Sequence, residues 1–341
     1  MACVRRTAWL ALAMCACTEA RFVGEDEPDG FSWDDAPAAA TASVRVRVAA
    51  WNLEGLGAPG SLEYEAVQDV LARLDADVVV LEEVDALEEA AFSQLAADLG
   101  YPEAAIASDH PFGSIGNAAM TRLPVVSFRY PSASTLSGDP LARDLTRLVP
   151  VLELEVPGST LHLGVVGTHL KSGFEDADYV RRAVDAVRTA QAADRVADVG
   201  ATLVLGDFNE DLADAPAAVA PLVGPVLGLP EDWTLGADLA EDFEGAGLRY
   251  DPFAPLVDRG FSAVDAERRR GGTATRPSSG RRIDYAWFSG GEGVRVTGAE
   301  VYSSADEAWE GLADGPVPPY DASMFAADHL PLLVEVAFPG L

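Results

Sequence analysis

Cysteine is almost absent from this sequence. The three cysteines, Cys3, Cys15 and Cys17, all lie within the first 17 residues of a chain of 341. The rest of the chain therefore offers no disulfide, no thiol nucleophile and no cysteine-based zinc site. Histidine is also scarce, with four residues in all. Only two of them, His169 and His329, lie next to predicted strands, and two separated histidines are not a preferred ligand set for zinc. Zinc is therefore disfavoured as well.

Positive charge is the second deficit. Lys and Arg number 24 against 55 Asp and Glu, which gives a formal net charge of −31. The mean field of such a protein repels polyanions and anionic membranes. A phosphate-bearing substrate therefore needs local help, from clustered arginines or from a bound cation. Without such a cluster, the acidic excess indicates only solubility.

Long apolar runs are missing after the N-terminal leader, and none is long enough to span a membrane. The leader, residues 1–17, has two arginines followed by a short apolar stretch, which is typical of a secretory signal peptide. Its end, AMCAC, resembles a bacterial lipoprotein box with Cys17 as the lipidated residue, although Met14 departs from that pattern. We expect an exported protein, secreted or held in the cell envelope as a lipoprotein, with membrane contact only through that anchor.

One domain is expected after the leader. Residues 18–43 are rich in acid, Pro, Gly and Ala without periodicity, which predicts an acidic flexible tether. Hydrophobic residues make up 49% of the chain, ample for a core in the remaining residues 44–341. The Gly- and Pro-rich region 215–280 is interpreted as insertions on one rim of that domain.

Apolar periodicity predicts strands that alternate with helices in places and follow one another in others. Helices are predicted over 62–74, 87–99 and 180–196. Strands are predicted within 44–52, 75–85, 116–130, 148–156, 159–173, 202–209, 281–289 and 331–338. This order favours stacked β-sheets with helices outside them over a single parallel sheet.

Polar residues recur where apolar strands end or begin. In the stretch TLVLGDFNED, Asp207 and Asn209 follow a buried strand and lie on one side if the chain stays extended. Glu210 and Asp211 are interpreted as bystanders. Each polar residue alone has an ordinary interpretation: an Asn after a strand as a turn residue, Glu83 as a surface carboxylate and His169 as a structural histidine. Together they favour one cleft. The set comprises Asn52, Glu83, His169, Asp207, Asn209, Asp284, Asp328 and His329.

Three members of this set suit a hard cation. Asn52, Glu83 and Asp328 offer oxygen ligands of the kind that Mg²⁺ prefers, with Mn²⁺ or Ca²⁺ as substitutes. Asp284 is placed to orient His329, and such a pair beside a metal deprotonates water for attack at phosphorus.

The other three members have roles at the phosphate. Asp207 is expected to hold the water or to protonate the leaving oxygen. Asn209 and His169 are expected to donate hydrogen bonds to the non-bridging oxygens.

Seven segments around these polar residues, taken in chain order, resemble the endonuclease/exonuclease/phosphatase superfamily. This superfamily includes DNase I, apurinic endonucleases, inositol polyphosphate 5-phosphatases and neutral sphingomyelinases. The matching segments are WNLEG, VVVLEEV, GNAAMTRLPV, THLKSG, VLGDFNED, RRIDYAWF and ADHLPLLVEV. The resemblance implies a DNase I-like, four-layer α/β/β/α sandwich of the α+β class, with its site at one edge of the paired sheets. It also implies a Mg²⁺-dependent phosphoesterase that uses in-line attack by water.

By position, the resemblance gives each polar residue the role already described for it. THLKSG followed by an arginine-led helix at Arg182 resembles a bacterial, mostly secreted branch of the superfamily, often labelled as nucleases. Arg143 fits an Arg-Asp pair of the same branch and is expected to contact phosphate, unless it is an ordinary surface arginine. Lys171 of THLKSG is assigned to substrate binding as well. One departure is Glu82, where the family has Gln; it adds negative charge near the metal or points away into a salt bridge.

The arginine-rich segment ERRRGGTATRPSSGRR, residues 267–282, stands out against the acidic background. We interpret it as a phosphate-gripping loop that uses Arg276 and Arg282. The alternative is a basic surface loop that counterbalances nearby acid.

The sequence therefore predicts an exported Mg²⁺-dependent phosphodiesterase, with nucleic acid as the first expectation for its phosphoester substrate. An inositol phosphate phosphatase or a sphingomyelinase-type phospholipase C is the alternative. A catalytically silent binding protein is disfavoured because the whole polar set is present. Nothing in the sequence indicates an obligate protein partner.

Overall fold

The computed structural model describes residues 43–107, 112, 115–213, 226–244, 250–307 and 322–341. Every described residue belongs to the second of the two units of the chain, residues 41–341. The predicted signal peptide and all but the last residue of the predicted tether thus lie outside the described residues.

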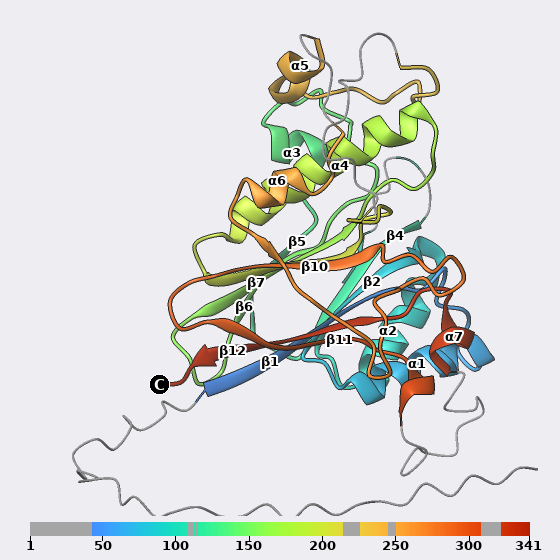
Figure 1. Cartoon of the computed structure of the whole chain (residues 1–341), viewed down its shortest axis with the longest axis vertical. Coiled ribbons are helices and arrows are strands. Elements are labelled where there is room, and N and C mark those ends of the chain that lie inside the picture. The colour runs from blue at the N-terminus through green and yellow to red at the C-terminus, as the bar shows by residue number, and fades with distance from the viewer. Residues whose placement is uncertain (1–42, 108–111, 113–114, 214–225, 245–249, 308–321) are drawn as a thin grey trace, which may run out of the picture. The chain divides into compact units, whose positions relative to one another are not determined.

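Two six-stranded sheets form the centre of the second unit (Figure 1). The strand order is β11-β12-β1-β2-β4-β3 in the first sheet and β5-β6-β7-β8-β10-β9 in the second. The strands of the first sheet are β1 (Ser43–Asn52), β2 (Val78–Asp85), β3 (Glu103–Ile106), β4 (Ile115–Thr121), β11 (Arg295–Val301) and β12 (Leu332–Pro339). Those of the second are β5 (Val125–Arg129), β6 (Val151–Glu155), β7 (His162–His169), β8 (Gly200–Asp207), β9 (Ser262–Ala263) and β10 (Asp284–Gly290).

Alternation along each strand creates two different faces. On β1, Val46 and Val48 lie in the core between the sheets, whereas Trp51 packs into the core on the helix side. On β8, Leu203 faces the same inner core and Val204 faces the opposite side. Strand β8 is buried on both faces, which explains why its sequence is almost continuously apolar.

Helices cover the outer face of both sheets (Figure 1). Helices α1, α2 and α7 pack on the first sheet, and α3, α4 and α6 pack on the second. These layers confirm the predicted α/β/β/α sandwich. The helices are α1 (Leu62–Leu74), α2 (Glu89–Asp98), α3 (Ala133–Ser137), α4 (Asp176–Ala193), α5 (Ala237–Glu244), α6 (Ala254–Val257) and α7 (Ala322–Ala326), with short 3-10 turns at η2 (Ala86–Glu88), η3 (Asp194–Val196) and η4 (Ser304–Asp306).

The structure differs from the sequence prediction in several elements. Residues 116–130 form two strands in different sheets, because the chain turns at Arg122–Pro124 and crosses from β4 to β5. Strands β3 and β11 were missed, since both are partly exposed edge strands with weak apolar patterns. Helix α4 begins at Asp176, before its apolar face starts.

The described parts of region 215–280 add α5, α6 and β9 to the second sheet's side; α5 packs against α4 through Leu239 and Val180. Within the described residues, no helix is both long and apolar enough to cross a membrane.

Candidate active site

Strand register brings the predicted polar residues to one edge of the sandwich. Strands β7 and β8 are parallel, and His169 is paired with Asp207 at their ends. Strand β10 runs antiparallel to β8, so its first residue, Asp284, also pairs with Asp207. In the first sheet, Asn52 at the end of β1 is paired with Glu82 of the parallel strand β2. Rigid strand ends therefore carry these side chains.

Asp284 and His329 form a buried pair. Nδ1 of His329 lies 2.9 Å and 3.1 Å from the two carboxylate oxygens of Asp284. The indole Nε1 of Trp51 donates to the carbonyl of His329 at 2.9 Å, and Oγ1 of Thr275 accepts the N–H of Asp284 at 3.1 Å. Both partners are thus fixed by neighbours, and the Nε2 atom of His329 is left for chemistry.

Asp207 lies at the centre of the site. Its carboxylate accepts hydrogen bonds from Nδ2 of Asn52 at 3.1 Å and from the N–H of Asn209 at 2.7 Å. Nδ2 of Asn209 donates to the same carboxylate at 3.1 Å and to the carbonyl of Leu170 at 3.0 Å. Asn209 adopts a left-handed φ of 52°, so the two side chains meet although the chain is not extended there. Because both amide hydrogens are engaged, Asn209 orients Asp207 here and has no free donor for phosphate.

Glu83 reaches the site through a distortion of its strand. A β-bulge lies between Glu82 and Val84 in the pairing with β4, and Glu83 has a left-handed φ of 59°. Bulges re-aim side chains at functional sites, and such backbone strain is often found there. Oε1 of Glu83 consequently lies 3.5 Å from Nε2 of His169, which is also 3.7 Å from Oδ2 of Asp207.

The protonation states of the site are far from ordinary. Burial, reinforced by the charge of Asp284, raises the pKa of Asp207 to about 7. Burial also opposes the charging of His329, but the Asp284, Asp207 and Asp328 carboxylates outweigh it and raise the pKa of His329 to about 9. Burial and the nearby Arg147 hold the pKa of His169 well below its usual range, so His169 is neutral.

The donor set fits a hard divalent cation. Ligand atoms of Asp207, Asp284 and His329 all lie within 4.8 Å of one another. Carboxylates this close repel each other unless a proton or a cation neutralises them. The predicted ligands Asn52 and Glu83 adjoin this group through Asp207 and His169. Oxygen ligands with few nitrogens favour hard cations over the softer metals.

A comparison with known protein families identifies the family to which the chain belongs. Residues 49–329 match the model of the Endonuclease/Exonuclease/phosphatase family. The chain belongs to this family. The resemblance predicted from the sequence is therefore confirmed, and the protein is a metal-dependent phosphoric ester hydrolase. The narrower branch suggested by THLKSG stays a prediction.

Solved structures show the same fold at low sequence identity. The endonuclease/exonuclease/phosphatase protein from Beutenbergia cavernae DSM 12333 is 21% identical, with a TM-score of 0.53 over 87% of this chain and 72% of that one. ANGEL2, a 2′,3′-cyclic phosphatase, is 16% identical, with a TM-score of 0.55 over 87% and 96%. Truncated TDP2 of Caenorhabditis elegans is 14% identical, with a TM-score of 0.51 over 86% and 98%. No curated protein matches the sequence.

Glu82, the departure from the family pattern, is completely buried between the sheets. Neither carboxylate oxygen has a hydrogen-bond partner among the described residues, so the expected alternative of a salt bridge is wrong. Burial, together with Asp284, Asp207 and Glu83, raises the pKa of Glu82 well above its usual range. Glu82 is consequently held as a neutral carboxylic acid, which resembles the family's Gln in shape and charge.

Arg147 is the site residue that sequence reasoning missed. Its Nη1 lies 3.5 Å from the carbonyl oxygen of His169 and 3.3 Å from that of Leu170. Burial lowers the pKa of Arg147, and the charges of Asp185, Glu83 and Asp207 counteract this effect. Arg147 is thus a cation beside the catalytic edge. The only sequence signal for Arg147 was its place four residues after Arg143, the arginine that was expected to contact phosphate.

The four predicted substrate-binding residues have different surroundings. Arg143 is exposed and its backbone pairs with Thr234, beside the buried ion pair of Asp144 and Arg188. Lys171 forms an ion pair with Asp178 at 2.8 Å.

Arg276 is ion-paired with Asp328 at 2.6 Å, and Asp328 lies 3.7 Å from His329. Arg282 donates to the carbonyl of Val264 and stacks over Tyr285. Of the four, only Arg276 directly contacts a member of the predicted catalytic and metal set.

The remaining arginines of segment 267–282 mostly face acid. Arg268 pairs with Asp306, Arg269 with Glu300 and Arg281 with Glu210. For these three arginines, the contacts favour the alternative interpretation of a basic loop that counterbalances nearby acid.

Glu210 and Asp211, interpreted from the sequence as bystanders of the polar set, have partners outside the predicted catalytic and metal residues. Glu210 is 8% exposed and accepts from Arg182 at 2.8 Å and from the hydroxyl of Tyr250. Asp211 accepts the N–H of Arg282 at 3.2 Å. Both residues fasten the loop that follows Asp207 to its surroundings.

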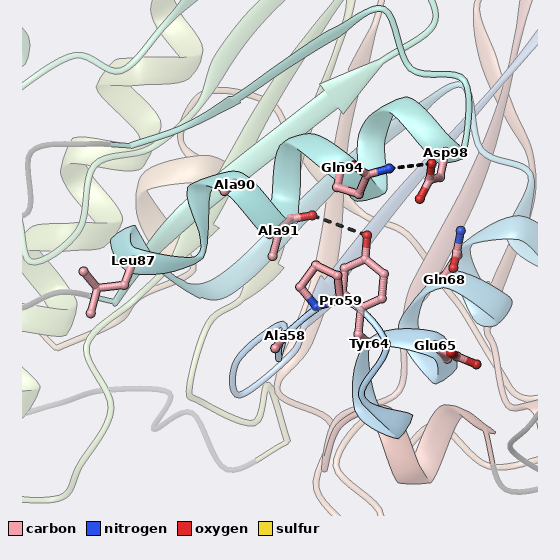
Figure 2. A pocket seen from close by; sticks show the side chains of 11 residues that line it. Ala58, Pro59, Tyr64, Glu65, Gln68, Leu87, Ala90, Ala91, Gln94 and Asp98 are labelled. Carbon is pink, nitrogen blue, oxygen red and sulfur yellow. Dashed lines mark hydrogen bonds between the residues drawn. The ribbon is translucent and has the colours of Figure 1, made fainter.

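Two cavities lie on the side of the first sheet. One of about 570 Å³ adjoins Asp328 and is lined by Glu54, Glu63, Met324 and Phe325 among others. Another, of about 620 Å³, lies between α1 and α2, where the hydroxyl of Tyr64 reaches toward the carbonyl of Ala91 (Figure 2). No catalytic or metal residue lines this second cavity, so it is separate from the active site.

Proposed function

We propose that the protein is an exported, Mg²⁺-dependent phosphodiesterase that acts on nucleic acid. The observation that carries the proposal is the buried Asp284–His329 pair beside Asp207, with a neutral His169 on the other side of the carboxylate. The N-terminal leader supports export.

The metal would be held by Asn52, Glu83 and Asp328, next to Asp207. When bound, Mg²⁺ supplies positive charge that stabilises the phosphate oxygens in the transition state and favours ionisation of water. Two of the ligands come from strands of the first sheet, Asn52 from the end of β1 and Glu83 from β2, and Asp328 comes from the segment before β12. The second sheet provides His169, Asp207 and Asp284. The reacting phosphate is therefore expected between the two sheets' edges.

His329 is the group that accepts a proton from water. Asp284 binds its Nδ1 atom, which fixes the tautomer and leaves Nε2 as the reactive nitrogen. The same carboxylate stabilises the imidazolium that forms when the proton arrives. General-base catalysis of this kind contributes roughly 10²–10⁴-fold.

Asp207 and His169 act at the phosphate. A pKa of about 7 lets Asp207 carry a proton near neutral pH, which suits protonation of the leaving oxygen. His169 is neutral and neither of its ring nitrogens has a hydrogen-bond partner among the described residues, so it has a free N–H for a non-bridging oxygen. Arg147 adds fixed positive charge on the same side.

The location of positive charge supports a phosphoester substrate, and nucleic acid is the one that we propose. Arg147 and Lys171 provide cations beside His169 in a chain whose mean charge repels phosphate. The proposal is tested by incubating the purified protein with Mg²⁺ or Mn²⁺ and supercoiled DNA, RNA, bis-p-nitrophenyl phosphate, inositol phosphates or sphingomyelin. Cleavage of DNA or RNA is the expected result. Release of phosphate or phosphocholine with both nucleic acids left intact would contradict it.

A further inference from the structure

Helix α4 carries opposite charges on its buried face, one turn from each other. Arg182 and Asp185 are each 1% exposed and lie three positions apart, so they face the same side of the helix. Burial of charge is costly unless the groups are paired and hydrogen-bonded. The partners of these two residues therefore indicate what they are for.

The pair holds the backbone of Lys171 from both sides. The N–H of Lys171 donates to Oδ2 of Asp185 at 3.0 Å, and its carbonyl accepts from Nε of Arg182 at 2.7 Å. Nη2 of Arg182 also donates to the carbonyl of Gly173 at 2.5 Å. Lys171 follows His169 by two residues, so α4 fixes the segment through which β7 leaves the site.

The other oxygen of Asp185 holds a second segment. Oδ1 accepts the N–H of Thr146 at 2.7 Å, directly before Arg147. Arg147 in turn reaches the carbonyls of His169 and Leu170. A single carboxylate thus ties the segment of Arg147 to the segment of His169.

Arg182 extends the same support to a third segment. Its Nη1 donates to Oε2 of Glu210 at 2.8 Å, directly after Asn209. Tyr250 and Arg281 contact the same Glu210 carboxylate. One turn of α4 therefore connects the three segments that carry Arg147, His169 and Asn209.

We propose that Asp185 is a positioning residue, which sets Arg147 and His169 at the spacing that one substrate phosphate requires. The proposal rests on the proposed function, because it assigns both residues to phosphate. Asp185 itself has no oxygen free for substrate, since each one accepts a backbone N–H. It acts through the two segments that it joins.

The role requires a carboxylate rather than any polar group. Two N–H donors converge on Asp185, one on each oxygen, and Arg181 and Arg147 face it as cations. Burial raises the pKa of Asp185 to about 6, opposed by the hydrogen bonds from Thr146, so the group is ionised at neutral pH. Asparagine at this position keeps the volume but has one acceptor, and its NH₂ group would face the second N–H donor.

The test compares Asp185→Asn with Asp238→Asn in the full-length protein. Asp238 pairs with Arg188 of the same helix at 2.6 Å and does not contact the three segments, so its variant loses an ion pair to α4 but not the positioning. Steady-state hydrolysis of bis-p-nitrophenyl phosphate is measured at neutral pH, well below the melting temperature. Misplacement of phosphate-binding groups by about 1 Å costs on the order of 100-fold.

We expect kcat/KM to fall roughly 10- to 100-fold in Asp185→Asn and to stay within about twofold in Asp238→Asn. The Mg²⁺ concentration for half-maximal activity should not change, because Asn52, Glu83 and Asp328 lie outside the three segments. A purely structural role would lower the melting temperature and leave kcat/KM unchanged. That result, or an equal loss in both variants, would overturn the proposal.

Amide hydrogen exchange of the unmodified protein gives a second test, which does not depend on a variant that folds. The N–H groups of Thr146 and Lys171 should be protected together and should open with one common free energy. Exchange of either amide at the rate of a free loop would overturn the proposal. If the protein hydrolyses no phosphoester at all, the proposed function fails, and this protection still reports whether Asp185 joins the two segments.

Discussion

The imidazole of His329 and the carboxylate of Asp284 are joined across the two sheets of the sandwich, with Nδ1 2.9 Å from Oδ2. Asp284 begins β10 of the second sheet, whereas His329 precedes β12 of the first. Neither sheet alone contains the pair. Catalysis in this protein therefore depends on the packing of the inner core that holds the sheets together.

Replacement of His329 by alanine should lower kcat by roughly 10²–10⁴-fold, because the proton acceptor is removed. The dependence on Mg²⁺ should be nearly unchanged, since the three expected ligands remain. The control is His162→Ala, at the other end of β7, where the histidine is half-buried and paired with Glu153. Steady-state kinetics of both variants decide the matter, and full activity in His329→Ala would contradict the assignment.

Asp284→Asn should shift the pH dependence of kcat/KM. In the unmodified protein, neighbouring carboxylates raise the pKa of His329 to about 9, so activity rises as pH increases and the imidazole loses its proton. A bound cation disfavours the charged form of His329, so this rise in activity occurs at lower pH when the metal is present. Without the Asp284 charge, less negative charge opposes the effect of burial on His329, and the pKa of His329 falls. The rise in activity should therefore occur at lower pH in the variant than in the unmodified protein. The maximal rate should also fall, because the imidazole is no longer oriented. A profile measured from about pH 5 to about pH 10 checks both effects.

Glu83→Gln should raise the Mg²⁺ concentration needed for half-maximal activity by roughly 10-fold or more, because a charged oxygen ligand becomes neutral. Glu103→Gln, on the exposed edge strand β3, is the matched control and should behave like the unmodified protein. Titration of activity with MgCl₂ measures the difference. An unchanged requirement in Glu83→Gln would remove Glu83 from the ligand set.

Glu82→Gln should stabilise the protein at alkaline pH. The folded state keeps the proton on Glu82 above the ordinary pKa of 4.5, so its stability is fully present below that value and declines as pH rises. Glutamine has no such dependence. We expect similar free energies of unfolding at acidic pH and a gain of about 1–3 kcal/mol for the variant at alkaline pH. Urea denaturation across this range measures the gain, and an equal decline in both proteins would contradict a buried neutral Glu82.

The sequence predicted the strand ends well because apolar strands and their polar exits are local features. Asn52, His169 and Asp207 each follow a buried run, and register then brings them together. The bulge that re-aims Glu83 was not predictable in this way, since it depends on pairing with β4. The family resemblance supplied the role of Glu83 without its geometry.

Charged residues away from strand ends were the harder part. Arg147 and Asp185 carry no motif, and their importance appears only when α4 is packed against the segments after β7 and before β6. The contact of Glu210 with Arg182 was not predictable for the same reason, because Arg182 lies 28 residues earlier in the chain. Such long-range contacts leave no periodic signal in the sequence.

The central claim is that the edge around Asp207 hydrolyses phosphodiesters only with a divalent cation. The most direct measurement is hydrolysis of bis-p-nitrophenyl phosphate by the unmodified protein and by Asp207→Ala, with EDTA and then with excess Mg²⁺. We predict no hydrolysis in EDTA, recovery on addition of Mg²⁺, and a loss of at least roughly 100-fold in Asp207→Ala. Hydrolysis that persists in EDTA, or an Asp207→Ala variant as active as the unmodified protein, would contradict this account.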